Sequence, residues 1–190
     1  MRGVSAAMVA RQILDQNGLA HIRIEHVSGR LSDHYDPKNG VIRLSDEVYA
    51  STSVGAIGVA AHEAGHAVQY AQHYFPIRIR AALIPITTIG SNLAIPLAII
   101  GLFMGLYWLV DVGNILFLPV VLFQLVTLPV EYNASGRALR TLESENFLTA
   151  EELSGAKKVL SAAALTYVAA LVVAVANLLR LLLLRNRNRD

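Results

Sequence analysis

The sequence predicts a mainly α-helical protein with a small β-sheet, an α+β fold, built on a bundle of about three transmembrane helices. Only 16% of its 190 residues are charged, and the runs 81–110, 112–130 and 159–179 carry no charge at all. A helix of about 20 apolar residues spans the hydrocarbon core of a bilayer. Before these runs, alternating apolar and polar residues indicate strands.

Residues 1–80 begin with an amphipathic helix over 5–17, because its apolar residues recur with helical spacing. The stretch 21–27 alternates as a half-buried strand does. A further strand ends at the turn signal 36–40, which contains Pro and Asn-Gly, and another strand covers 41–45. The order is therefore helix, strand, strand, strand.

The next helix carries the stretch VAAHEAGHAV and runs to about Gln72. Ser51, Thr52 or Ser53 can cap its first turn. We expect one catalytic unit in four segments: 1–80 with the sheet and this helix, 81–130 with two transmembrane helices, 131–158 as a charged helical segment, and 159–190 with the last transmembrane helix. Within the segment 131–158, a turn near Asn146 is expected before a new helix that Thr149 starts.

The formal net charge is only +2, and the one basic run is the tail Arg185–Arg189. Such a tail fits lipid headgroups, and no other basic stripe indicates a nucleic-acid partner. The chain has no cysteine, which excludes disulfides and thiolate metal ligands. The expected partners are the lipid bilayer and a polypeptide, and the sequence gives no oligomeric state.

His62, Glu63 and His66 form an H-E-x-x-H motif. Residues four apart on a helix share one face, so both imidazoles can reach one metal ion. Glu63 is then placed to take a proton from the water that the ion activates. The alternative is a pair of solvated helix histidines with no metal.

A catalytic zinc ion takes three protein ligands, and three residues compete for the third position. His73 follows His66 by seven residues, whereas the metzincin pattern requires six with Gly at the place of Gln69. Asp111 is expected to end the first span, on the far side of the membrane. Glu131 ends the second span, and two crossings return it to the side of His62. Topology therefore favours Glu131.

The sequence resembles known membrane proteases. The motif H-E-x-x-H followed, after spans, by Glu131-Tyr132-Asn133-Ala134-Ser135 is similar to the E-x-x-A-[D/S] element of the HtpX and CAAX prenyl protease type. LSDHYDP, VAAHEAGHAVQ, GSNLA, LFQLVTLPVEYNAS and KVLSAAALTYVAAL resemble the bacterial YugP-like neutral zinc metallopeptidase family over nearly the whole chain. The resemblance implies a zincin-like fold, one Zn²⁺ per chain, a gluzincin-like ligand set of His62, His66 and Glu131, and Glu63 as general base.

Four further residues are candidates for the site. Ser135 stands where HtpX-type proteases have an aspartate that orients a ligand histidine, and serine would make that hydrogen bond more weakly. Arg137 would stabilise the transition state or anchor the chain at the membrane interface. His34 and Tyr35 would hold an extended substrate or an oxyanion. Equally, Asp33 and Asp36 beside them would only cap turns.

The function that these features predict is that of a membrane-embedded zinc endopeptidase acting on membrane or misfolded proteins. We expect it in the bacterial inner membrane with a cytoplasmic active site, because basic residues flank that side: Arg78, Arg80, Arg137, Arg140, Lys157 and Lys158. A site-2-type intramembrane protease is one alternative, although Asp111 is followed by Val112 rather than the Gly of that class. A zinc-stabilised, non-catalytic scaffold or adaptor is the other.

Overall fold

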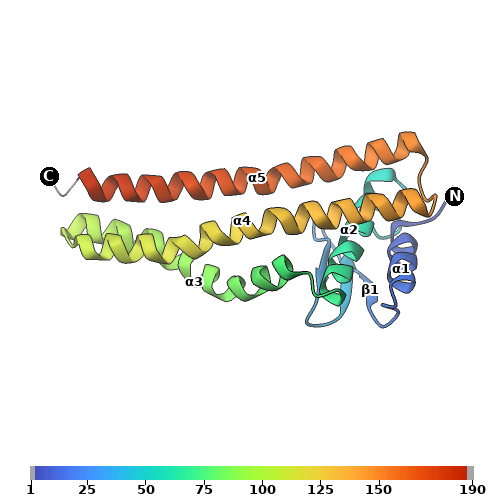
Figure 1. Cartoon of the computed structure of the whole chain (residues 1–190), viewed down its shortest axis with the longest axis horizontal. Coiled ribbons are helices and arrows are strands. Elements are labelled where there is room, and N and C mark those ends of the chain that lie inside the picture. Colours follow the sequence, from blue (N-terminus) through green and yellow to red (C-terminus); the bar gives the residue numbers. More distant parts are fainter. Residues whose placement is uncertain (1–2, 188–190) are drawn as a thin grey trace. The chain divides into compact units, whose positions relative to one another are not determined.

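The structure is a computed structural model that describes residues 3–187, with side chains to Leu183. Its elements are, in order, α1 (Ala6–Gln16), β1 (Arg23–His26), β2 (His34–Asp36), β3 (Val41–Leu44), α2 (Val54–Ala71), α3 (Phe75–Met104), α4 (Tyr107–Ser144) and α5 (Ala150–Arg187). The predicted fold, mainly α with one small sheet and three long apolar helices, is confirmed (Figure 1). The side chains of the basic tail lie outside the described residues.

Contacts divide the chain into two compact units. The first comprises Met1–Tyr74 and Glu131–Ala164, and the second comprises Phe75–Val130 and Leu165–Asp190. The helices α4 and α5 each contribute one part to each unit. All the residues of the candidate site described below belong to the first unit.

The sheet of the first unit has the strand order β1-β3-β2. β1 pairs with β3 in parallel and β2 pairs with β3 in antiparallel register, with Tyr35 opposite Ile42. β2 is therefore an edge strand of the sheet, and it contacts α2. α1 also packs against α2 (Figure 1).

The core of the first unit lies where α1, α2 and the sheet meet. Ser5 caps α1, whose apolar face of Val9, Ile13 and Leu14 is fully or almost fully buried. Among the three residues that could cap α2, Ser53 accepts the hydrogen bond, from the Ala56 N–H at 3.3 Å. Most of the buried residues of α2 are alanine and glycine, and these small residues let neighbouring backbones approach the helix closely.

Glycine is required on α2 at one close approach. A Cβ placed on Gly65 would lie 2.9 Å from the carbonyl oxygen of Ala134 on α4, closer than real Cβ atoms come to other heavy atoms. A Cβ on Gly58 would lie 3.5 Å from the Cβ of Ala156 on α5, an ordinary van der Waals contact. The backbones of α2 and α4 therefore touch at Gly65.

The predicted boundary between α4 and α5 is confirmed. Asn146 has a positive φ of 53° in the turn, and α5 starts at Ala150. The Thr149 N–H donates to Glu152 Oε2 at 2.9 Å, and the Glu152 N–H donates to Thr149 Oγ1 at 3.3 Å. This reciprocal pair of bonds is a capping box, which satisfies two backbone donors at a helix start.

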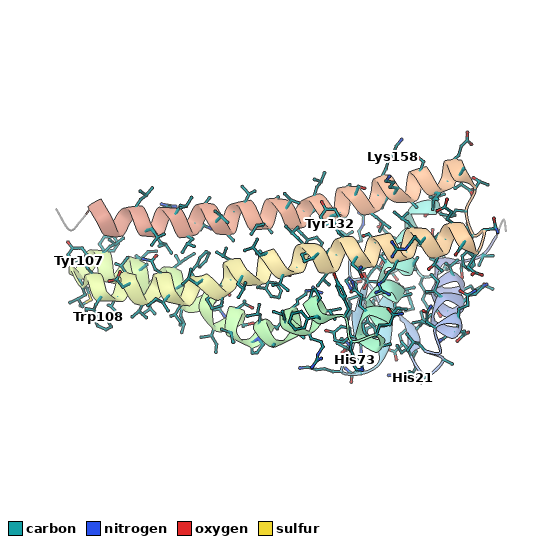
Figure 2. All side chains as sticks on the ribbon, in the orientation of Figure 1. His21, His73, Tyr107, Trp108, Tyr132 and Lys158 are labelled. Atoms are coloured by element: carbon teal, nitrogen blue, oxygen red, sulfur yellow. The ribbon has the colours of Figure 1, made fainter. Side chains whose placement is uncertain are left out.

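In the second unit, three helices carry segments long and apolar enough to cross a membrane. Small residues let α3 and α4 pack closely: a Cβ on Gly113 would lie 2.6 Å from the carbonyl oxygen of Ala94. Many large apolar side chains point outward instead of into this unit, as lipid-facing side chains do. Tyr107 and Trp108 are exposed at the start of α4 (Figure 2), which is typical of residues at a membrane interface.

The expectation that Asp111 ends the first span is wrong, because Asp111 lies inside α4. The turn falls at Gly105, which adopts a positive φ of 69°. The N–H of Leu106 donates to the carbonyl of Gly101 at 2.8 Å and closes the end of α3. A glycine that can take this conformation ends the helix more effectively than a single charge does.

The contact at Gly65 leads to a stability prediction. Gly65→Ala forces its Cβ into the Ala134 carbonyl and should destabilise the first unit by about 1–3 kcal/mol, the usual cost of overpacking. Gly58→Ala is the matched control on the same helix and should change stability by less than about 1 kcal/mol. Thermal unfolding of both variants in detergent micelles tests this, and equal melting temperatures would contradict the assigned contact.

Candidate metal centre

Three side chains from two helices converge in the first unit. His62 and His66 stand one turn apart on α2, and Glu131 comes from α4. Their potential ligand atoms are mutually close: His62 Nε2 lies 3.1 Å from His66 Nε2 and 3.1 Å from Glu131 Oε2, and His66 Nε2 lies 3.5 Å from that oxygen. These three residues form a group that could hold a metal ion.

The donor set fits a zinc ion on three counts. Ligand atoms held about 2.0–2.1 Å from one tetrahedral ion lie roughly 3.3 Å from each other, which is the spacing found here. Nitrogen and carboxylate oxygen are ligands that zinc prefers. The surroundings also favour positive charge: burial lowers the pKa of His66, but the hydrogen bond with Glu131 and the charges of Glu63 and Glu131 outweigh it and raise that pKa above its ordinary value.

The other ring nitrogen of each histidine has its own partner. His62 Nδ1 lies 3.1 Å from Ser135 Oγ, and His66 Nδ1 lies 3.0 Å from Gln69 Oε1. Histidine ligands of metals almost always have such a partner, which sets the ring orientation. Ser135 was a candidate from the sequence, whereas Gln69 was not. Gln69 could have been predicted from its spacing, because a residue three positions after His66 lies on the same face of the helix.

Gln69 belongs to a longer chain of hydrogen bonds. Its Nε2 donates to Asn133 Oδ1 at 2.9 Å, and the same oxygen accepts a bond from Arg137 Nε at 2.7 Å. Arg137 Nη1 also donates to Gln72 Oε1 at 2.6 Å. The guanidinium of Arg137 is thus held by two side-chain amides.

Glu63 lies outside the three-residue group but beside it, and it is 8% exposed. Its Oε2 accepts a hydrogen bond from the backbone N–H of Tyr35 at 2.9 Å, so the carboxylate is fixed between α2 and the edge strand β2. The Tyr35 ring packs edge-on against Tyr70, and burial raises the pKa of its phenol above the ordinary value. The phenol therefore stays neutral around pH 7.

Other residues considered from the sequence lie outside this group. His34 is exposed, with Nδ1 at 2.7 Å from the Ser32 carbonyl oxygen and Nε2 at 3.3 Å from Arg43 Nη1. His73 is also exposed, beyond the end of α2 (Figure 2), and Asp111 belongs to the second unit.

The aspartates beside Tyr35 bond to groups of the sheet and of its turn. Asp33 accepts bonds from the backbone N–H and the hydroxyl of Ser45 at 2.8 and 3.0 Å. Asp36 Oδ1 accepts from the N–H of Lys38 at 3.0 Å and closes the predicted turn. Hydrogen bonds from Asn39 and Arg43 hold the pKa of the Asp36 carboxyl well below its usual range.

The fold and the site together define a class of protein. Its described residues include three helices long enough to cross a membrane and a two-histidine, one-glutamate group able to bind a metal ion. The family described as "putative neutral zinc metallopeptidase" matches residues 1–186, and the chain belongs to this family. It is 46% identical over 188 residues to the "Putative membrane protease YugP" of Bacillus subtilis (strain 168), covering 99% of this chain and 84% of that protein. No solved structure was found to match. The resemblance seen in the sequence is confirmed.

The geometry predicts which substitutions weaken metal binding. Purified protein should bind one zinc ion per chain, and Glu131→Gln or His66→Ala should weaken binding by more than about 100-fold, because loss of a ligand exceeds the cost of losing a residue that only orients one. His73→Ala and Asp111→Asn are matched controls and should bind as the wild type does. Competition with a chromogenic chelator measures these affinities. Retained affinity in Glu131→Gln would exclude Glu131 as a ligand.

Proposed function

We propose that this protein is a membrane-embedded zinc endopeptidase in which His62, His66 and Glu131 hold one Zn²⁺ and Glu63 is the general base. The observation that carries the proposal is the position of Glu63. Its carboxylate is buried next to the three converging ligand atoms and faces an edge strand. Membership of a zinc metallopeptidase family supports peptide-bond hydrolysis as the reaction.

The chain's own residues supply the proton transfers. A zinc ion held by the three ligands would polarise the scissile carbonyl and lower the pKa of a neighbouring water molecule towards about 7. Glu63 takes the proton of that water and delivers it to the leaving amine nitrogen. The bond from the Tyr35 N–H to Glu63 Oε2 orients the carboxylate for this role, because a buried carboxylate with a fixed partner keeps one position.

The substrate would be an extended polypeptide. The N–H of Tyr35 is bonded to Glu63, so it points away from β3, at the sheet edge that β2 forms beside α2. An extended segment can add to such an edge as a further strand, which brings its peptide bonds alongside α2. Tyr35 is thus a substrate-binding residue in this proposal. Arg137 stays a candidate either for stabilising the transition state or for anchoring the chain at the membrane interface.

The proposed substrates are membrane or misfolded proteins at the membrane surface. Glu131 directly follows the charge-free run 112–130, so the third ligand stands at the boundary between apolar and polar sequence. Basic residues flank that boundary, which favours a cytoplasmic site in the bacterial inner membrane under the positive-inside rule. The site therefore meets chains that enter or leave the bilayer there.

Cleavage of an unfolded model protein in detergent micelles tests the proposal. Glu63→Gln should keep the zinc content of the wild type but lower the cleavage rate by about 10²–10⁴-fold, the usual contribution of a general base. Glu47→Gln changes an exposed glutamate and is the matched control, with unchanged rate. A zinc-loaded wild type that cuts no better than Glu63→Gln would contradict the proposal and favour a scaffold.

A further inference from the structure

A small pocket lies in the first unit where α1, α2 and α4 meet, three helices that Figure 1 shows together. Its volume is about 200 Å³. One water molecule needs about 10–15 Å³ of such space, so the pocket has room for a polar group of several atoms. Its polar lining consists of Arg137, Arg140 and Thr141 on α4 and Asn17 at the end of α1. No acidic residue is among the described residues that line it, so the pocket is positively charged.

Neither arginine has an acidic partner among the described residues. The guanidinium of Arg137 donates to Asn133 Oδ1 and Gln72 Oε1, two neutral amide oxygens that do not compensate its charge. Three of its five N–H groups remain for another acceptor. The side chain of Arg140 is exposed and makes no hydrogen bond or ion pair with a described residue. Both cations can therefore accept an anion without giving up an ion pair.

The two guanidinium groups are turned in the same direction along α4. The Nε of Arg137 lies 2.7 Å from Asn133 Oδ1, one helical turn before its own Cα. The Nη1 of Arg140 lies back over Gly136, 3.5 Å from where a Cβ on that residue would stand. Long side chains on helices do cover the preceding turn in this way. The two charges therefore gather over residues 133–137, where their mutual repulsion favours a bound anion.

This position matches the depth of lipid phosphates. Glu131 directly follows the charge-free run 112–130. With a rise of 1.5 Å per residue, Asn133 and Gly136 lie about 3 Å and about 8 Å beyond Glu131 along the helix. The polar layer on each side of the hydrocarbon core is about 5–8 Å thick. Both guanidinium groups are thus at the level of the headgroups, where basic pockets bind anionic lipids.

We propose that the pocket lined by Arg137 and Arg140 binds a phosphate group, with the headgroup of an anionic lipid as its source at this depth. The planar guanidinium fork suits phosphate because it can donate two parallel hydrogen bonds to two of its oxygens. The hydroxyl of Thr141 and the amide of Asn17 are further polar groups of the same pocket. The proposal gives the interfacial role considered for Arg137 a defined ligand, and it depends neither on zinc nor on cleavage.

Isothermal titration calorimetry on the full chain in neutral detergent micelles, at constant chloride concentration, tests the proposal with three probes. Dihexanoyl phosphatidylglycerol presents a lipid phosphate, inorganic phosphate presents the same chemistry from solution, and dihexanoylglycerol has the acyl chains without a phosphate. We expect phosphatidylglycerol to bind and dihexanoylglycerol not to bind. Binding of inorganic phosphate as tight as that of phosphatidylglycerol would support the phosphate site but identify free phosphate as its source.

Variants of the pocket then show where the probe binds. Arg140→Gln and Arg137→Gln should each raise the Kd for phosphatidylglycerol by about 10-fold or more, since each removes charge-assisted hydrogen bonds. Arg140→Lys keeps the charge but loses the fork, so its Kd should lie between those of the wild type and Arg140→Gln. Lys158→Gln removes an exposed charge on α5 that does not line the pocket (Figure 2) and is the matched control, with a change below about 2-fold.

Helical content and melting temperature confirm that each variant is folded, and Arg140 is exposed, so its replacement leaves the core intact. The proposal is overturned if neither phosphate probe binds, or if dihexanoylglycerol binds as tightly as phosphatidylglycerol. It is also overturned if Arg140→Gln binds phosphatidylglycerol as the wild type does. An equal loss in Lys158→Gln would overturn it as well, because net charge and not the pocket would then attract the lipid.

Discussion

The site depends on one close contact between two helices. The backbone of α2 meets that of α4 at Gly65, where a side chain would collide with the Ala134 carbonyl. His66 directly follows Gly65, and Glu131 lies one helical turn before Ala134. The contact that packs the helices therefore also carries the carboxylate to 3.1 Å from His62 Nε2. A side chain at Gly65 would push the two helices apart, and Glu131 would move with α4 away from the histidines of α2.

Electrostatics then explain why this polar cluster is stable inside the first unit. Glu131 is 2% exposed and Glu63 is 8% exposed, so two carboxylates are buried within one site. Burial of an ionised carboxylate is costly unless a partner or a metal ion compensates it. Here each has a partner: the histidines face Glu131, and the Tyr35 N–H faces Glu63. A bound cation would offset the same negative charge, which links metal binding to the stability of the fold.

The sequence predicted the elements and the metal motif, since these depend on local spacing. Glu131 could be chosen by counting membrane crossings, and its carboxylate indeed lies beside His62. Gln69 and Asn133 were not predicted from the sequence. Their hydrogen bond joins α2 to α4, and no spacing along the chain reveals a contact between two helices. The prediction for Asp111 failed because it relied on a local signal, the single charge between two apolar runs. The end of α3 is instead decided by the backbone freedom of Gly105.

The most direct test of the account is X-ray absorption at the zinc edge, on wild type and Glu131→Gln loaded with one equivalent of zinc. The account predicts two imidazole nitrogens and carboxylate oxygen at about 2.0–2.2 Å in the wild type. It also predicts that the carboxylate oxygen is lost in Glu131→Gln. Identical spectra for the two proteins, or a shell with a single imidazole, would contradict the assignment of His62, His66 and Glu131 as the metal site.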